Sequence, residues 1–342
     1  MIVRARAPLR LGLAGGGTDL SPFCDLHGGC VLNATIDLYA YAHIETTRDQ
    51  GLTFSARDMQ VEYATSAIPA LELSGPLPLH KAVYNRIVRE FCGGRPLPMK
   101  LVTQCDAPPG SGLGSSSTLV VAMIKAFVEW LQLPLGEYDV ARLAFEIERR
   151  DVGLSGGRQD QYAATFGGFN FMEFYAEDRV IVNPLRIKNW ILSELESSIV
   201  LYSTGVSRSS AEIIDEQTRN MRKPGSTSID ALKRLKEDAV AMKEAILKGD
   251  FKRLVDRMRD SWEAKKLTAH GITTPEIEDL FSRAMGAGAL AGKVSGAGGG
   301  GFIIFFVDPS RRMDVIRAVS AAGGEVRPCH FTKRGTEGWR LD

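Results

Sequence analysis

A glycine- and serine-rich stretch, Pro108–Ser117, has the composition of an anion-binding loop. Its three glycines alternate with small residues, and the apolar run 118–124 that follows can form a helix. Glycine allows close approach of the backbone to a ligand, and a helix N-terminus offers unpaired N–H groups and a positive dipole end. The stretch therefore predicts a phosphate site. The alternative is a flexible loop in which Ser115, Ser116 or Ser117 caps the helix.

Four charged residues elsewhere in the chain are candidates for chemistry at such a site. Glu148 lies near the end of a predicted helix and Asp160 begins the next one, and the glycine-containing loop 153–157 permits a turn that brings both carboxylates into one cleft. Asp19 follows a glycine turn, and Arg10 places one charge between two leucines of a predicted strand. The alternatives are solvated carboxylates, a local Asx turn at Asp19 and an edge-strand arginine.

Two glycine patterns are close to nucleotide-binding motifs without matching them. No lysine follows the glycines of Pro108–Ser117, so this stretch is not a Walker A loop. Gly296–Gly301 matches G-x-G-x-x-G, but the apolar run 302–307 after it predicts a strand, where a dinucleotide-binding motif requires a helix. We therefore expect Gly296–Gly301 to pack against another loop or a phosphate, with an NAD-dependent enzyme as the alternative.

The elements that must position these residues divide the chain into two halves. In the first half, Ile2–Leu13 predicts two short strands with a break at Pro8, and Val31–Glu45 predicts a strand pair. The predicted helices span 79–92, 117–131, 138–149, 159–166, 209–222, 228–248, 251–267 and 275–286. Apolar residues of 228–248 recur at the spacing of a buried helix face. The chain closes over 289–331 with strand, glycine loop, strand, helix and strand.

The overall composition is that of an ordinary globular protein, with 342 residues, 44% hydrophobic and 24% charged. The net charge of +1 gives no indication of nucleic-acid or anionic membrane binding. Five cysteines without a C-x-x-C pair indicate reduced thiols, as in a cytoplasm, and no histidine spacing predicts zinc. The N-terminus lacks a signal-peptide pattern, and no apolar run reaches transmembrane length. We expect a cytoplasmic protein of two domains.

Three glycine-rich stretches, taken together, resemble the GHMP kinases, the family of galactokinase, homoserine kinase, mevalonate kinase and phosphomevalonate kinase. Residues 7–19 read A-P-L-R-L-G-L-A-G-G-G-T-D, residues 108–117 read P-P-G-S-G-L-G-S-S-S, and residues 293–301 read K-V-S-G-A-G-G-G-G. The resemblance implies a two-domain α+β fold with the active site between the domains. Residues 1–195 are expected to form a ribosomal-protein-S5-like mixed sheet with helices that binds ATP, and residues 196–342 a ferredoxin-like GHMP kinase C-terminal domain.

The G-G-G-T-D of the first stretch is similar to the branch of this family that contains kinases of heptose 7-phosphate and of L-fucose, as are 157–164 and 204–210. Galactokinases and mevalonate kinases carry G-E-H at that place instead. The resemblance implies transfer of the ATP γ-phosphate to the anomeric hydroxyl of D-glycero-D-manno-heptose 7-phosphate. The 1,7-bisphosphate would then serve nucleotide-heptose and surface-glycan synthesis, in capsule or lipopolysaccharide. The alternatives are a 1-kinase of L-fucose or another sugar and a non-catalytic sugar sensor on the same fold.

The resemblance also implies roles for individual residues. Asp160 matches the catalytic aspartate, which accepts or orients the proton of the attacking hydroxyl, and Arg10 matches the catalytic cation. Ser116 and Glu148 match the magnesium ligands. The residues implied to bind ATP are Pro109, Gly110, Ser111, Gly112, Leu113, Gly114, Ser115, Ser116 and Ser117. The residues implied to bind the sugar substrate are Gly16, Gly17, Thr18, Asp19, Asp160, Arg208 and Gly298.

A substrate that already carries a phosphate requires a second anion site. Arg208 has serines on both sides, and a guanidinium can bind phosphate with two parallel hydrogen bonds, so we expect Arg208 to bind this group. Lys293 and Arg158 are further candidates, and a surface arginine near a helix start is the alternative for Arg208. The expected partners are ATP, Mg²⁺ and a small-molecule sugar phosphate, with no nucleic acid and no membrane. The sequence leaves a homodimer open.

Overall fold

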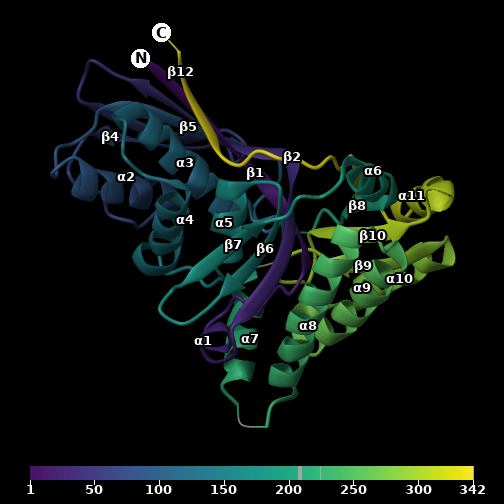
Figure 1. The fold of residues 1–342 in the computed structure, drawn as a ribbon. Helices are drawn as coiled ribbons and strands as arrows, with labels where there is room; N and C mark the ends of the chain where they lie inside the picture. The colour runs from purple at the N-terminus through teal and green to yellow at the C-terminus, as the bar shows by residue number, and fades with distance from the viewer. Residues whose placement is uncertain (207–209, 224, 342) are drawn as a thin grey trace.

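The computed structural model describes residues 1–206, 210–223 and 225–341. Figure 1 shows the N-terminal half of the chain, in purple to teal, on one side of the molecule and most of the C-terminal half, in green to yellow, on the other; the last strand, Glu337–Leu341, returns to the N-terminal half. Each half contains a sheet covered by helices, so the fold is the predicted α+β arrangement of two domains.

The larger sheet has eight strands and belongs mainly to the N-terminal half. Its strands are β1 (Ile2–Ala14), β2 (Gly29–Thr46), β3 (Gly51–Ala56), β4 (Val61–Ser66), β5 (Met99–Cys105), β6 (Phe169–Phe174), β7 (Val180–Pro184) and β12 (Glu337–Leu341). The order along one path is β12-β1-β2-β5-β3-β4, and β6 and β7 branch from β2. The sheet is mixed, because β3 and β5 are parallel while the other pairs are antiparallel.

Strands β1 and β2 are each continuous, so the predicted break at Pro8 and the predicted strand pair over 31–45 are wrong. Pro8 has no N–H to donate, but it lies where the pairing of β1 with β2 shifts register, between Pro8 and Arg10. Strand β2 changes its partner and not its direction, since residues 29–34 pair with β6 and residues 40–46 pair with β5. The alternation of side chains along the sequence is the same for one long strand that changes partner and for two paired strands, so it does not distinguish them.

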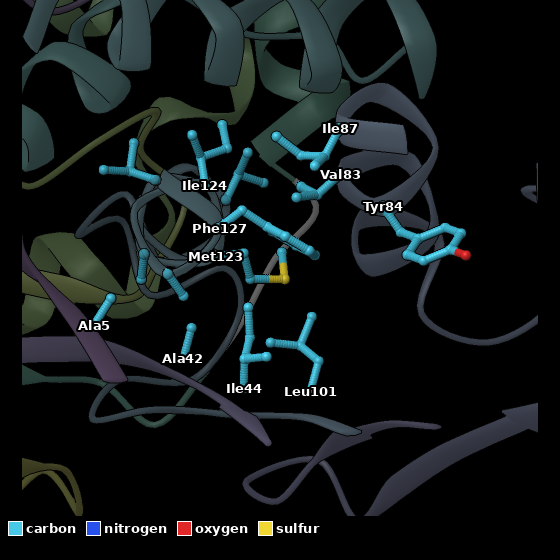
Figure 2. Close-up of a cluster of buried hydrophobic side chains, with 14 of the residues drawn as sticks. Ala5, Ala42, Ile44, Val83, Tyr84, Ile87, Leu101, Met123, Ile124 and Phe127 are labelled. Carbon is cyan, nitrogen blue, oxygen red and sulfur yellow. The ribbon is translucent and has the colours of Figure 1, made fainter. Parts of the chain in front are cut away.

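Five α-helices accompany the larger sheet in the N-terminal half. They are α1 (Phe23–His27), α2 (Pro78–Phe91), α3 (Ser115–Leu131), α4 (Glu137–Glu146) and α5 (Gln159–Phe166), and a π-helical turn, Ile147–Asp151, follows α4. The apolar sequence of α3 buries it between α2 and the sheet. Figure 2 shows Met123 and Phe127 of α3 between Ile87 of α2 and the strand residues Ile44 and Leu101. This packing fixes the axis of α3 relative to the sheet.

The second sheet is antiparallel and has the order β11-β8-β10-β9. Its strands are β8 (Ile199–Ser203), β9 (Ala289–Val294), β10 (Phe302–Val307) and β11 (Glu325–Arg327). The accompanying helices are α6 (Asn189–Ser198), α7 (Ser210–Met221), α8 (Thr227–Lys248), α9 (Phe251–Lys266), α10 (Pro275–Gly286) and α11 (Arg312–Ser320). The predicted apolar face of α8 is buried, as Leu235, Ala239 and Met242 show.

One buried cluster joins the two halves. It contains Leu9 and Leu32 of the larger sheet, Met242 of α8 and Ile304 of β10. Burial of this apolar surface stabilises a fixed relative position of the two sheets. Strand β12 adds a second connection, because the chain returns from the smaller sheet and pairs antiparallel with β1. The division between residues 195 and 196 stays a prediction, and the last strand lies in the larger sheet.

The five cysteines form no disulfide. Among the described residues, no helix combines the length and the apolar composition that crossing a membrane requires.

Candidate active site

The three glycine-rich stretches meet at a cavity of about 520 Å³ that is lined by both halves of the molecule. The residues predicted from the sequence that line it are Arg10, Gly17, Asp19, Pro109, Gly110, Gly112, Gly114, Ser115, Ser116, Ser117, Glu148 and Asp160. Helix α7, Lys265 of α9, and Gly296 and Ala297 of the third stretch contribute the opposite side. Residues far apart in the sequence are therefore brought to one open cavity.

The second and third glycine-rich stretches are held together by hydrogen bonds and by close packing of their backbones. The Ser295 hydroxyl donates to the Gly112 carbonyl at 3.0 Å, and the Phe302 N–H donates to the Ser111 carbonyl at 2.9 Å. A Cβ on Gly112, whose φ is +78°, would lie 2.4 Å from the Ser295 carbonyl oxygen. This confirms that Gly296–Gly301 packs against another loop. Strand β10 follows it directly, which removes the dinucleotide-binding alternative.

Helix α3 begins at the cavity, directly after Gly114. Gly114 has a φ of +78° and is the N-cap, and its carbonyl accepts the first intrahelical bond, from Thr118. The N–H groups of Ser115, Ser116 and Ser117 therefore have no acceptor within the helix. No serine hydroxyl caps the helix. Backbone donors and the helix dipole thus face the space where an anion would bind.

Ser116 and Glu148 lie side by side, although 32 residues separate them in the sequence. The Ser116 hydroxyl donates to Glu148 Oε1 at 3.0 Å, and Gln161 Nε2 donates to Oε2 at 2.5 Å. Glu148 is only 1% exposed and lies in the π-helical turn after α4. A hydroxyl and a carboxylate beside a phosphate site fit Mg²⁺, which takes few protein ligands and completes its shell with water and phosphate oxygens.

The described residues contain no group of three or more histidine, cysteine, aspartate or glutamate side chains placed to hold a metal ion. The sequence had not singled out Gln161, which also donates to Ser117 at 3.0 Å and so fixes the position of Glu148.

Arg10 and Asp160 form a charge pair in the wall of the cavity. Arg10 Nε donates to Asp160 Oδ1 at 2.7 Å, and Nη1 donates to the Gly112 carbonyl at 2.5 Å. Arg10 is 3% exposed and follows the register shift in β1, whereas the Asp160 side chain is 20% exposed and lies in the first turn of α5. A Cβ on Gly114 would lie 3.0 Å from Asp160 Cγ. Asp160 thus faces the loop that begins α3.

Asp19 accepts hydrogen bonds that hold the start of α5. Its Oδ2 accepts from the N–H groups of Arg158, at 2.9 Å, and Gln159, at 3.2 Å, and its Oδ1 accepts from the N–H of Gly17 at 3.2 Å. Asp19 is 2% exposed and still lines the cavity. Since α5 carries Asp160, this carboxylate positions the neighbouring one.

Some residues predicted at the site have other contacts. In the described structure, Gly16, Thr18, Ser111, Leu113 and Gly298 do not line the cavity. Thr18 is fully buried, and its hydroxyl bonds to the Gly15 carbonyl of the first turn and to the backbone of Cys30 in β2. Gly298 packs against the backbone of the 270–272 turn. Arg208, the predicted contact to a second phosphate, lies outside the described residues.

Two further cations that were predicted to bind a phosphate have partners within the protein. Lys293 Nζ donates to the carbonyls of Gly12 and Leu13, at 2.6 and 3.2 Å. Arg158 pairs with Asp178 at 2.7 Å. Neither side chain lines the cavity, so the prediction that Lys293 or Arg158 binds a second phosphate is wrong.

Lys265 lines the cavity and was missed by the sequence analysis. It is 7% exposed, and its Nζ donates to the Gly16 carbonyl at 3.0 Å. Burial lowers the pKa of Lys265 to about 8, and the Asp19 carboxylate opposes this shift. In the sequence it stands beside Lys266 and looks solvated. Its spacing from the buried residues Met258 and Trp262 was the available signal, since it continues the same helix face.

The chain matches the family models of the GHMP kinases N terminal domain, over residues 78–168, and of the GHMP kinases C terminal region, over residues 242–325. It is 48% identical over 99% of its length to the D-glycero-alpha-D-manno-heptose 7-phosphate kinase of Campylobacter jejuni, of which it covers 99%. It is 27% identical over 92% of its length to the bifunctional fucokinase/GDP-fucose pyrophosphorylase of Arabidopsis thaliana, and covers 30% of that protein.

Solved structures show the same relationship. A D-glycero-D-manno-heptose 1-phosphate kinase from Bacteroides thetaiotaomicron is 48% identical, with a TM-score of 0.85 over 99% of both chains. A mevalonate kinase structure that is 18% identical, with a TM-score of 0.76 over 97% of this chain and 99% of the other, shows the fold alone. The chain therefore belongs to the GHMP kinase family, as a phosphotransferase that uses ATP and has an alcohol group as acceptor.

Proposed function

We propose that this protein is a sugar kinase that transfers the γ-phosphate of ATP to the anomeric hydroxyl of D-glycero-D-manno-heptose 7-phosphate, yielding the 1,7-bisphosphate and ADP. The observation that carries the proposal is the meeting of three features in one cavity: the Arg10–Asp160 pair, the Ser116–Glu148 pair and the start of α3. The full-length identity of 48% to a kinase named for this substrate supports the choice of sugar.

The phosphates of ATP would bind to the backbone of the loop that precedes α3. We assign this role to the stretch Pro109–Ser117, including Ser111 and Leu113, whose backbone shapes the loop behind the cavity wall. Ser116 and Glu148 would hold Mg²⁺, which when bound supplies positive charge to the phosphate oxygens. Phosphoryl transfer depends mainly on positioning and on charge stabilisation, and these groups provide both.

Asp160 would accept the proton of the anomeric hydroxyl as the sugar oxygen attacks the γ-phosphorus and ADP leaves. Arg10 holds the Asp160 carboxylate and the Gly112 carbonyl at once, so it fixes the base relative to the phosphate loop. The same guanidinium carries positive charge beside the reacting groups, where negative charge develops. In this proposal Asp160 accepts the proton, Arg10 orients Asp160, and the phosphate loop, Arg10 and the bound Mg²⁺ neutralise the charge of the phosphates.

The turn Gly16–Asp19 would form the sugar side of the cavity. Gly17 and Asp19 line it, while Gly16 and Thr18 shape the turn behind them. We assign to Gly298 the bracing of the third stretch. Arg208 remains a proposed contact to the phosphate that the substrate already carries.

We further propose a cytoplasmic location, because the five cysteines are unpaired. The synthesis of nucleotide-heptose and a role in surface glycans stay predictions from the resemblance, and the question of a homodimer stays open.

The names of the two heptose kinases differ in the position of the phosphate, so the test must identify the phosphorylated atom. The purified protein is incubated with MgATP and D-glycero-D-manno-heptose 7-phosphate, ADP release is measured, and the product is examined by phosphorus NMR. We expect a new phosphate coupled to the anomeric proton. Turnover of free L-fucose without turnover of the heptose phosphate would instead support a fucose 1-kinase. ATP binding without ADP release on any sugar would support a sensor.

A further inference from the structure

Lys265 is a buried cation at the cavity wall, and two of its three N–H donors have no hydrogen-bond acceptor among the described residues. Within the described residues, the one hydrogen bond of its ammonium group is to the Gly16 carbonyl, at 3.0 Å. An ammonium group has three N–H donors, so two remain for another acceptor. Burial of an incompletely paired charge is unfavourable. A ligand in the cavity that lies beside Lys265 would supply the missing acceptors.

The charges around Lys265 favour an anionic ligand. Asp19 already accepts from three backbone N–H groups, and Asp160 is paired with Arg10. The positive charges of Lys265 and Arg10 add to burial in lowering the pKa of Lys293, to about 7. Within the described residues, neither carboxylate is hydrogen-bonded to the Lys265 ammonium, so its charge is left for an anionic ligand.

The position of Lys265 separates it from the loop proposed to bind ATP. Its Nζ would lie 3.1 Å from a Cβ on Gly17, and Gln217 Oε1 would lie 3.7 Å from the same point. Both neighbours belong to the wall formed by the first glycine turn and α7, whereas Ser116 and Glu148 form the wall at α3. Lys265 therefore lies on the wall that contains the first glycine turn, which the proposed function assigns to the acceptor sugar.

We propose that Lys265 binds the phosphate group that the acceptor sugar already carries, through the two N–H donors that Gly16 leaves free. The proposal rests on the proposed function, in that the acceptor is a phosphorylated sugar. It assigns substrate selection to a residue of α9, in the C-terminal half of the chain, in contact with the first glycine turn of the N-terminal half.

The test compares two proteins on two acceptors. Wild type and Lys265→Gln are assayed with D-glycero-D-manno-heptose 7-phosphate and with the unphosphorylated heptose. We expect Lys265→Gln to lower kcat/KM for the phosphorylated sugar by roughly 10- to 100-fold, as for loss of a charged hydrogen bond. The kcat/KM for the unphosphorylated heptose and the KM for ATP should stay nearly unchanged. Lys265→Arg should recover part of the loss. Lys266→Gln, which changes the neighbouring lysine outside the cavity, is the control.

An equal loss on both sugars would overturn the proposal, because Lys265 would then contact a hydroxyl or act only in folding. If Lys265→Gln does not fold, as judged by circular dichroism, the same comparison is made with Lys265→Met and Lys265→Arg. If wild type phosphorylates neither heptose, the proposed function fails separately. Binding of inorganic phosphate is then measured by calorimetry, with the same weakening expected in Lys265→Gln, and equal or absent binding in both proteins overturns the proposal.

Discussion

Arg10 and Asp160 form a charge pair in which the guanidinium Nε lies 2.7 Å from Oδ1 of the carboxylate. The pair joins β1 to α5, which are 150 residues apart in the sequence. Because Arg10 also donates to Gly112, one side chain sets the distance between the proposed base and the proposed phosphate loop. Changes at either end of this pair should therefore affect the chemical step more than the binding of ATP.

Asp160→Asn should lower kcat by roughly 10²- to 10⁴-fold, the usual contribution of a general base. Asparagine keeps the volume of aspartate but cannot accept the proton. The affinity for ATP should change little, because the phosphate loop is formed by other residues. Steady-state kinetics and calorimetric titration with ATP measure the two effects. Retention of full activity would show that Asp160 is not the base.

Ser116→Ala and Glu148→Gln should each raise the Mg²⁺ concentration needed for half-maximal activity, by about tenfold or more. The first removes a hydroxyl ligand from the proposed metal position, and the second replaces a charged carboxylate ligand with a neutral amide. ADP release is measured across a Mg²⁺ titration at fixed ATP. Ser115→Ala serves as the comparison, since the Ser115 hydroxyl donates to the Pro108 carbonyl and not to Glu148. An unchanged Mg²⁺ requirement in both variants would place the metal elsewhere.

Gly112→Ala should disturb the contact between the second and third glycine-rich stretches. The added Cβ would lie 2.4 Å from the Ser295 carbonyl oxygen, which cannot move without its loop. Gly94→Ala is a matched control, because Gly94 has a φ of +79°, close to the +78° of Gly112, and a Cβ there meets nothing within 4 Å.

Both glycine substitutions should cost about 1–2 kcal/mol of folding free energy from backbone strain. Only Gly112→Ala should cost more than that and also lower kcat/KM. Urea unfolding and steady-state kinetics measure these quantities. Equal behaviour of the two variants would mean that the contact between the stretches does not support activity.

His80 should make the stability fall in mild acid. Burial lowers the pKa of His80 to about 4, whereas an unfolded histidine has a pKa of about 6.5. Between these values the unfolded state binds a proton that the folded state does not. The free energy of unfolding is therefore complete above about pH 6.5 and falls by about 1.4 kcal/mol per unit as the pH drops toward 4.

The variant His80→Gln tests this pH dependence. Glutamine can replace the contact of His80 Nε2 with the Thr103 hydroxyl, at 2.8 Å, and does not titrate. Urea unfolding at pH 7 and pH 5 should show a loss in wild type that is about 2 kcal/mol larger than the loss in the variant. Identical losses in both proteins would assign the acid sensitivity to other groups.

The sequence predicted best what depends on local order. The glycine stretches and the buried face of α8 follow from spacing along the chain, and the resemblance named Arg10, Asp160, Ser116 and Glu148, which the structure brings together. What it did not predict depends on contacts between distant segments. The continuity of β2 comes from a change of partner strand, which leaves the alternation of side chains unaltered.

Lys265 illustrates the same limit within a helix. Lys265 and Lys266 are identical in type and adjacent in sequence, yet the first is 7% exposed at the cavity and the second contacts Glu263 at the surface. The two lysines differ only in which face of α9 they occupy. The residue types around them do not reveal this face, but the spacing of Lys265 from the buried residues Met258 and Trp262 does.

The pairing of β1 with β12 has a consequence for biosynthesis. Arg6 and Glu337, which form an ion pair across these strands, are 331 residues apart in the chain. At roughly 5–20 residues per second, a ribosome needs roughly 15 to 70 seconds to synthesise that interval. Throughout this time the outer edge of the strand that carries Arg10 has no partner from its own chain, and an open edge can pair with another molecule. A nascent chain of this protein is thus exposed to misassembly at the strand on which its chemistry depends.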